Sequence, residues 1–422
     1  MLSSTTSNIY KEVNFSQFQT SPIKKLIGNL FIRHLFFPLA TPSSSLTNRL
    51  KKKEIEVQNF WTGSIENPEF PTASKIREHF THRKEQISMS VNGKDLTVLV
   101  EIIESQDKHS EIFYQLALGL PNLATISTYI EGIYPFLEQY LLKKKENPNI
   151  LPARFFLISA YDTTLSPQKT PHYPDSLDES GLILSNTLKR LATSYGKIHL
   201  LITHSVSSFR LAAAAQYGID IDNICVDRGS SCVEELSKIY LLGKLNLMPI
   251  GKLCGWDLDV GKEIQKHLFP KENTNIIVSG VALDHRFPGD ANLCNHPQIR
   301  QAAGFSIIPS KTQSSLIKIF FLALGVFGII HNRPFMVATA CCITILGNGS
   351  SNKLEKSTKT ESLAKIILLQ FDFPLIQPHT SHHTMPLNKF HFHNLLDEYK
   401  DQNFLLEKKA LPEALLTLSY RS

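Results

Sequence analysis

Residues 200–215 read LLITHSVSSFRLAAAA, and the fold expected for this chain follows from this stretch. Residues 197–203 are apolar and rich in Leu and Ile, which is typical of a buried strand. Residues 205–218 then favour a helix, which Gly218 ends. The chain therefore passes from a strand into a helix through a tight turn at Ser205, as in one unit of a parallel α/β sheet.

Strand and helix patterns alternate in the same way along most of the chain. Asn92 and Gly93 separate the first two strands and favour a hairpin turn. Either Asp175 or Ser176 can cap the helix that begins at 177. This alternation predicts a mostly parallel sheet with helices on both faces. The expected strands cover 87–91, 96–104, 111–118, 153–160, 197–203, 223–227, 274–280 and 364–373, and the expected helices cover 128–145, 177–194 and 205–218.

Composition excludes several classes of protein. The 422 residues are 42% hydrophobic and 19% charged, so most of the chain can bury a sizeable core and is not disordered. The net charge of +6 is too small to indicate a nucleic-acid partner. Residues 1–53 hold eight basic side chains and one acidic side chain, so the charge is concentrated there. The six cysteines lack disulfide or zinc spacing and are expected to be free thiols.

Two segments outside the α/β core combine features that suit a membrane surface. Residues 22–40 are apolar and basic, which is typical of an interfacial helix or of a helix packed on the core. Residues 316–346 contain two apolar runs separated by 331–334 (HNRP), and each run is shorter than the roughly 20 residues of a membrane span. This second segment is compatible with a re-entrant or interfacial hairpin, with two buried helices, or with a hydrophobic lid.

Five segments are expected along the chain. A mobile basic N-terminal part with an apolar helix is followed by a connecting part, the α/β core, a hydrophobic insertion with a polar linker, and a C-terminal part that contains the last strand and a histidine-rich loop. The respective ranges are 1–53, 54–84, 85–300, 301–362 and 363–422.

Ser205 is the strongest candidate for a reactive side chain. A serine on a tight turn between a buried strand and a helix projects its hydroxyl above the sheet, and the N–H of Val206 then faces a developing oxyanion. The alternative is structural, because a serine at this place can also be the N-cap of the helix.

These residues resemble the nucleophile elbow of the α/β-hydrolase superfamily, whose pattern is Gly-x-Ser-x-Gly. Thr203 and Ser207 stand where the two glycines belong. The resemblance implies a serine nucleophile followed in the chain by an acid and then by a histidine. Residues 154–168 resemble the strand and loop that precede the elbow helix in that superfamily.

The same resemblance implies the other members of a catalytic triad. Residues 275–293 resemble the strand and loop that carry the acid, which implies Asp284. Asp227 is the alternative acid, and it can instead pair with Arg228 or cap the next turn. Residues 379–393 resemble the terminal His-x-x-Pro-Leu loop and imply a histidine base. That base is His383 or, as alternatives, His382, His379, His331 or His296.

The resemblance also implies an oxyanion hole and no cofactor. Residues 111–126 resemble the strand and loop that supply its second donor, which implies the N–H of Asn122 or Leu123 beside that of Val206, since Pro121 lacks an N–H. The clustered histidines of 379–393 lack a partner carboxylate, so a metal site is not indicated.

Residues 225–257 resemble a more specific group within the superfamily. The run CVDRGSSC at 225–232 and the Gly-Trp of 255–256 are similar to the Asp-Arg-x-x-Ser-Ser and Gly-Trp features of the chlamydial CHLPS family. Related hydrolase-like proteins occur among effectors of intracellular bacteria such as Legionella. This resemblance implies a bacterial protein, without a classical signal peptide, that is cytoplasmic or secreted into a host cell and is membrane-associated in one reading.

Two functions follow from these observations. The first is a serine hydrolase of the esterase or lipase type that cleaves an ester or a lipid-like acyl bond through Ser205, His383 and Asp284. The second is a catalytically inactive effector that keeps the scaffold, has lost the elbow glycines, and binds a membrane or a host protein. An integral membrane protein with a soluble domain is a third reading.

Overall fold

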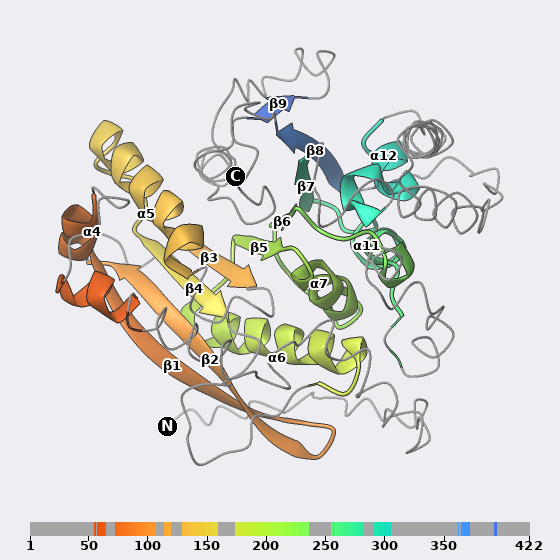
Figure 1. Ribbon diagram of the computed structural model, residues 1–422, viewed down its shortest axis with the longest axis horizontal. Coiled ribbons are helices and arrows are strands. Elements are labelled where there is room, and N and C mark those ends of the chain that lie inside the picture. Colours follow the sequence, from red (N-terminus) through yellow and green to blue (C-terminus); the bar gives the residue numbers. More distant parts are fainter. Residues whose placement is uncertain are drawn as a thin grey trace, which may run out of the picture.

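The computed structural model places the strands of this chain in a single sheet. It describes residues 55, 57–64, 72–106, 114–119, 129–158, 174–235, 255, 257–281, 291–304, 362, 364–371 and 392–394. The described strands follow the order β1-β2-β4-β3-β5-β6-β7-β8-β9 across the sheet (Figure 1). Strands β3 to β8 are parallel to one another, whereas β1, β2 and β9 pair in antiparallel fashion. The predicted mostly parallel sheet is therefore confirmed.

The strand bounds lie close to the expected ones in the parallel part of the sheet. The strands are β1 (Phe80–Val91), β2 (Lys94–Ser105), β3 (Tyr114–Gly119), β4 (Ala153–Ile158), β5 (Leu200–His204), β6 (Asn223–Asp227), β7 (Asn275–Val281), β8 (Lys365–Phe371) and β9 (Phe392–Asn394).

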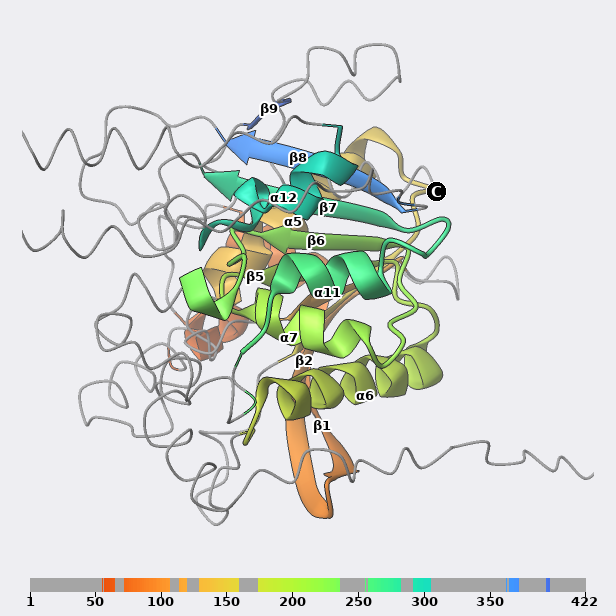
Figure 2. The ribbon, with the colours of Figure 1, turned by 90° about the vertical axis from the view of Figure 1, so that its right-hand side faces the viewer.

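Helices cover both faces of this sheet. Figure 2 shows α6, α7 and α11 in front of the strands, with α4 and α5 behind them. The described helices are α4 (Ala73–His79), α5 (Tyr129–Glu146), α6 (Leu177–Tyr195), α7 (Ser207–Ala215), α11 (Val260–His267), α12 (Pro297–Ala302) and the 3-10 turn η4 (Leu293–Asn295). The sequence predicts α5, α6 and α7, but α4, α11 and α12 are too short for a clear periodic pattern.

Helix α7 is buried along its whole length. Every residue from Ser207 to Ala215 is buried, because the helix lies against the sheet and also contacts α6 and α11. The close approach of α6 depends on Gly181, where a Cβ would overlap backbone atoms of Ala213. The small side chains of the four consecutive alanines at 212–215 therefore allow close packing. This packing fixes the position of the helix that follows the Ser205 turn.

The predicted hairpin is confirmed, and it is longer than expected. Asn92 and Gly93 have φ values of 52° and 72°, as a two-residue hairpin turn with two left-handed positions requires. Strand β1 begins at Phe80, whereas the sequence predicts a strand only from 87. The first half of β1 was missed because it carries exposed charged side chains. Charged residues are common on edge strands, where they hide the alternating pattern of the strand.

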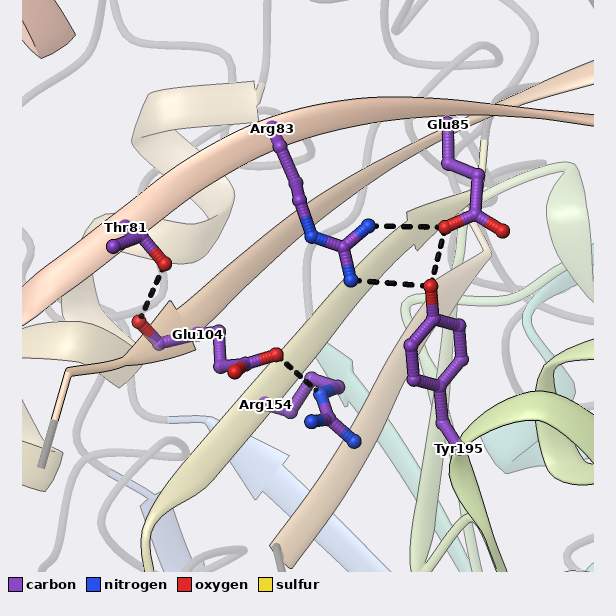
Figure 3. Close-up of polar contacts among 6 residues, drawn as sticks. All are labelled: Thr81, Arg83, Glu85, Glu104, Arg154 and Tyr195. Atoms are coloured by element: carbon purple, nitrogen blue, oxygen red, sulfur yellow. Dashed lines mark hydrogen bonds and ion pairs between the residues drawn. The ribbon is translucent and has the colours of Figure 1, made fainter. Parts of the chain in front are cut away.

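Polar contacts attach this hairpin to the body of the sheet (Figure 3). The Arg83 guanidinium donates to Glu85 at 3.0 Å and to the hydroxyl of Tyr195 at 3.1 Å, and Tyr195 in turn donates to Glu85. Arg154 of β4 donates to Glu104 of β2 at 2.7 Å, and its guanidinium lies 4.8 Å from the centre of the Tyr195 ring. The C-terminal end of α6 is thereby fixed on β1 and β4.

Helix α6 begins as the sequence predicts, with Ser176 as the capping residue. The Ser176 side chain accepts from the N–H of Glu179 at 3.1 Å, and Asp175 instead binds Lys94. Within the described part of the chain, no helix is long and apolar enough to cross a membrane. The segments 1–53 and 316–346 lie outside the described residues, so their predicted membrane contacts stay predictions.

Candidate functional site

The carboxyl ends of β3 and β5 mark a change of direction in the sheet. From β3 the chain runs through α5 to β4 on one side, and from β5 it runs through α7 to β6 on the other side. Helices α5 and α7 lie on opposite faces (Figure 2). In open α/β sheets, the crevice at such a point, outside the carboxyl ends of the strands, is where ligands bind.

Ser205 lies at this point in a strained backbone conformation. It follows β5 directly and has φ of 59°, in the left-handed region that non-glycine residues rarely adopt. Helix α7 begins two residues later, and its N-cap position is occupied by Val206 rather than by Ser205. The strand, the strained serine and the helix thus follow one another directly, as the sequence predicts for a sharp turn at Ser205.

The N–H groups of Ser205 and Val206 differ in their hydrogen bonds. The Ser205 N–H donates to the carbonyl of Asp227 at 3.1 Å. Among the residues that the structure describes, none accepts a hydrogen bond from the N–H of Val206. This N–H, at the N-terminal end of α7, is where the sequence predicts the first oxyanion donor.

Thr203 and Ser207 replace the two elbow glycines and are both fully buried. Thr203 pairs in the sheet with Gly119 of β3 and Val226 of β6. Gly229 relieves crowding on the other side, since a Cβ there would lie 2.5 Å from the Val226 side chain and 3.0 Å from Cβ of Ser208. Gly229 thus allows the segment after β6 to lie close to the first turn of α7.

Asp227 lies beside the elbow and is fully engaged in contacts. His204 and Asp227 are paired residues at the ends of β5 and β6, and His204 Nδ1 lies 2.8 Å from Asp227 Oδ2. The same oxygen accepts from Nε and Nη2 of Arg228 at 2.9 and 2.7 Å. Asp227 Oδ1 accepts from the hydroxyl of Ser279 on β7 at 2.8 Å. We call His204, Asp227, Arg228 and Ser279 the strand-end cluster.

Charge decides the protonation state of this cluster. Burial alone would raise the pKa of Asp227, but the charge of Arg228 and the hydrogen bonds from His204 and Arg228 outweigh it and hold that pKa well below its usual range. Asp227 is therefore an ionised acceptor, so Nδ1 of His204 must carry a proton and donate. Burial raises the pKa of the nearby Cys225 thiol, which is therefore neutral and unreactive.

The sequence predicts one of the partners of Asp227 and not the other two. Its pairing with Arg228 was one of the alternatives, and the structure confirms it. The contacts with His204 and Ser279 were not predicted. The last residues of neighbouring parallel strands lie at the same edge of a sheet, so the predicted strand ends could have indicated these two contacts.

His296, one of the alternative bases, is part of the packing around α11. It is buried, its Nε2 lies 2.9 Å from Asp259 Oδ1, and its ring fills the space where Gly261 has no side chain. Asp259 caps α11 by accepting from the N–H of Lys262 at 2.9 Å. The pair thus joins the start of α12 to the start of α11.

The other predicted site residues lie outside the described residues, but their flanking segments are described. Asp284 comes three residues after the end of β7, and the chain is described again at Ala291, whose carbonyl accepts from the N–H of Ser231 at 2.8 Å. Antiparallel pairing of Phe371 with Phe392 brings both ends of 372–391 to the carboxyl end of β8. The predicted residues outside the described part are Asp284, His383, His382, His379, His331, Asn122 and Leu123.

The described part of the chain contains free thiols and no cluster of metal-binding side chains. No group of three or more His, Cys, Asp or Glu side chains there could hold a metal ion. Cys225, Cys232 and Cys294 are free thiols, and burial raises the pKa of Cys232 to about 11. For these three residues the predicted free thiols are confirmed.

No protein-family model matches this chain, and no curated protein matches its sequence. Among solved structures, an esterase from Pyrococcus furiosus is 11% identical, with 48% of this chain and 72% of that chain covered and a TM-score of 0.30. An acylaminoacyl peptidase from Pyrococcus horikoshii is 11% identical, with 53% and 35% covered and a TM-score of 0.33. The esterase domain of a Rhodothermus marinus protein is 9% identical, with 50% and 80% covered and a TM-score of 0.29. Similarities this low do not show a family.

Proposed function

We propose that this protein is a serine hydrolase of the α/β-hydrolase type, with Ser205 as its nucleophile. The observation that carries the proposal is the left-handed conformation of Ser205 between β5 and α7. A non-glycine residue in this conformation costs about 1–2 kcal/mol, and such strain is concentrated at functional sites.

The order of the strands supports the other triad members. Strands β5, β6, β7 and β8 are consecutive neighbours in the sheet. The segments that contain Asp284 and His383 start from the carboxyl ends of β7 and β8, at the same edge as Ser205. Asp227 is less suited to be the triad acid, because its carboxylate already binds His204, Arg228 and Ser279.

The proposed reaction is acyl transfer to water. Ser205 Oγ attacks the acyl carbonyl while His383 accepts its proton, and Asp284 orients the imidazole. The N–H groups of Val206 and of Asn122 or Leu123 stabilise the oxyanion. His383 then donates a proton to the leaving alcohol, and a water molecule releases the acyl group in the same way. No cofactor enters this scheme.

Labelling with a fluorophosphonate probe tests the proposal. The wild-type protein is expected to react covalently with the probe and to hydrolyse p-nitrophenyl acetate, and Ser205→Ala is expected to lose both properties. Ser185→Ala is a matched control, because it removes a buried serine hydroxyl of α6 and leaves the elbow unchanged. If the wild type neither reacts with the probe nor cleaves the ester, it is not a serine hydrolase.

The same assay assigns the base and the acid. Asp284→Asn is expected to reduce ester hydrolysis far more than Asp227→Asn does, relative to the stability that each variant loses. Single alanine variants of the candidate histidines are compared at equal folded fraction, and the largest loss of kcat identifies the base. The candidates are His383, His382, His379 and His331.

An ester or lipid-like substrate and a membrane-associated effector role complete the proposal. They are supported by the apolar residues of 22–40 and 316–346, by the basic residues of 1–53 and by the resemblance of 225–257 to the CHLPS family. Deleting 1–53 is expected to weaken binding to vesicles that contain anionic lipid, because that segment holds eight basic side chains and one acidic side chain, whereas the rest of the chain is close to neutral. Unchanged vesicle binding would exclude this role for 1–53. Absence of probe labelling together with retained vesicle binding would instead favour the inactive effector.

A further inference from the structure

Two adjacent strands, β5 and β6, end at the same level of the sheet, and each is followed directly by a strained residue. His204 and Asp227 are paired across β5 and β6, and the next residue of each strand, Ser205 or Arg228, is left-handed with φ of 59° or 47°. For a residue with a Cβ atom, this conformation is less stable than an ordinary strand or helix conformation. Contacts that exist only in the strained arrangement must offset this cost.

Main-chain hydrogen bonds provide the first set of these contacts. The Ser205 N–H donates to the carbonyl of Asp227 at 3.1 Å, and the Arg228 N–H donates to the carbonyl of Ser279 at 2.8 Å. Each strained residue is thus bound to the next strand of the sheet, in the order β5, β6 and β7. Movement of Asp227 would therefore change the position of Ser205 directly.

Side chains of the strand-end cluster provide the second set. The Asp227 carboxylate is the centre, because it accepts from His204 on β5, from Arg228 and from Ser279 on β7. Asp227 and Arg228 are almost fully buried, with side-chain exposures of 1% and 3%, whereas His204 is 23% exposed. Charge-assisted hydrogen bonds are stronger than neutral ones, and the low dielectric of a buried site strengthens them further.

We infer that His204 and Asp227 are positioning residues for Ser205. His204 donates through Nδ1 to the buried carboxylate, and this contact holds the end of β5 so that Ser205 keeps its left-handed conformation. The expected effect on catalysis rests on the proposed function. The expected effect on the conformation of Ser205 does not, since that conformation can be measured without any substrate. It also assigns Asp227 to the support of the elbow rather than to the triad.

The test compares His204→Ala with His204→Asn. The amide nitrogen of asparagine lies close to the place of Nδ1, so His204→Asn keeps a donor for Asp227 but has no group equivalent to Nε2. Amide hydrogen exchange at Ser205, measured by mass spectrometry, is expected to be at least about tenfold faster in His204→Ala, because the N–H to Asp227 is released. His204→Asn is expected to restore most of the protection.

Kinetics provide a readout that a general loss of stability would not produce. At equal folded fraction, His204→Ala is expected to lower kcat for p-nitrophenyl acetate and the fluorophosphonate reaction rate by about 10–100-fold, with KM changed less than about threefold, because the nucleophile is misplaced. His204→Asn is expected to recover both rates to within about threefold. Ser279→Ala, which removes one contact of Asp227, is expected to show a smaller loss in the same direction.

His267→Ala is the control, because it removes a histidine that pairs with Glu263 on α11 and is expected to leave the Ser205 exchange rate unchanged.

Unchanged Ser205 exchange in His204→Ala would overturn the inference. A His204→Asn variant as impaired as His204→Ala would also overturn it, since His204 would then act through Nε2. If the wild type lacks hydrolase activity, the proposed function fails, and the exchange measurement still decides this inference. If His204→Ala does not fold, Ser279→Ala and His204→Asn decide it.

Discussion

Replacing Asp227 by asparagine removes a buried charge without changing the shape of the side chain. In the wild type, the Asp227 carboxylate accepts from three nitrogen atoms at 2.7–2.9 Å and from the Ser279 hydroxyl at 2.8 Å. In the variant, the Arg228 guanidinium loses the carboxylate that neutralises it, while its side chain stays only 3% exposed. Breaking one partner of a buried ion pair typically costs 3–5 kcal/mol. Because the asparagine oxygen still accepts, we expect the free energy of unfolding to fall by about 3 kcal/mol.

Urea unfolding followed by circular dichroism measures this loss. The slope of the unfolding free energy with urea should stay unchanged, so that the shift of the midpoint reports stability alone. Asp259→Asn is the matched control. It weakens a similar aspartate–histidine contact in which the aspartate side chain is 29% exposed, and it is expected to cost about 1 kcal/mol or less.

A double-mutant cycle with Arg228→Gln shows whether the loss comes from the pair. If each single variant leaves one buried charge without its partner, the double variant is more stable than the sum of the two losses predicts. We expect a coupling of at least about 1.5 kcal/mol. A single-variant loss below about 1 kcal/mol, or a coupling close to zero, would refute the view that Asp227 and Arg228 form a charged pair that holds the ends of the strands.

Three further predictions concern backbone strain, packing and pH. Ser205→Gly should be more stable than Ser205→Ala by about 1 kcal/mol in urea unfolding, because glycine adopts the left-handed region without strain, and both should lose probe labelling; equal stability would contradict the strain. Gly181→Ala should cost about 3 kcal/mol or more, because its Cβ would overlap the backbone of Ala213, whereas Gly218→Ala, with nothing within 4 Å, should cost only about 1 kcal/mol of strain. Because the pKa of Asp227 is lowered on folding, its ionisation stabilises the protein above the unfolded pKa of about 3.9, and this contribution is lost as the pH falls below that value. Between pH 4 and pH 2 the unfolding free energy of Asp227→Asn should therefore depend less steeply on pH, by up to about 1.4 kcal/mol per pH unit; parallel curves would exclude a lowered pKa.

The parallel strands could be predicted because they are buried on both faces. Residues 223–227 form β6 with the predicted bounds, and all five of its residues are buried. The first half of β1 could not be predicted, because a strand at the edge of a sheet carries exposed charged residues that mask its period. Short helices such as α4 and α12, of seven and six residues, contain too few turns for an apolar stripe to be recognised.

The candidate site could be predicted in part for a similar reason. The position of Ser205 follows from local information, since a strand that runs directly into a helix leaves only a tight turn between them. The partners of Asp227 could not be deduced in this way. Ser279 lies 52 residues further along the chain and reaches Asp227 only because β6 and β7 are neighbours in register. The assignment of Asp284 and His383 stays a prediction.

By itself, the sequence determined the alternation of strands and helices, the hairpin at Asn92 and Gly93, and the sharp turn at Ser205. These features depend on side chains that are near one another in the chain, so their patterns can be read locally. Only the tertiary structure decided that Ser205 is left-handed, that Val206 rather than Ser205 occupies the N-cap position, and that His204, Asp227, Arg228 and Ser279 form one cluster. These features depend on the order and register of neighbouring strands, which bring together residues that are far apart in the chain.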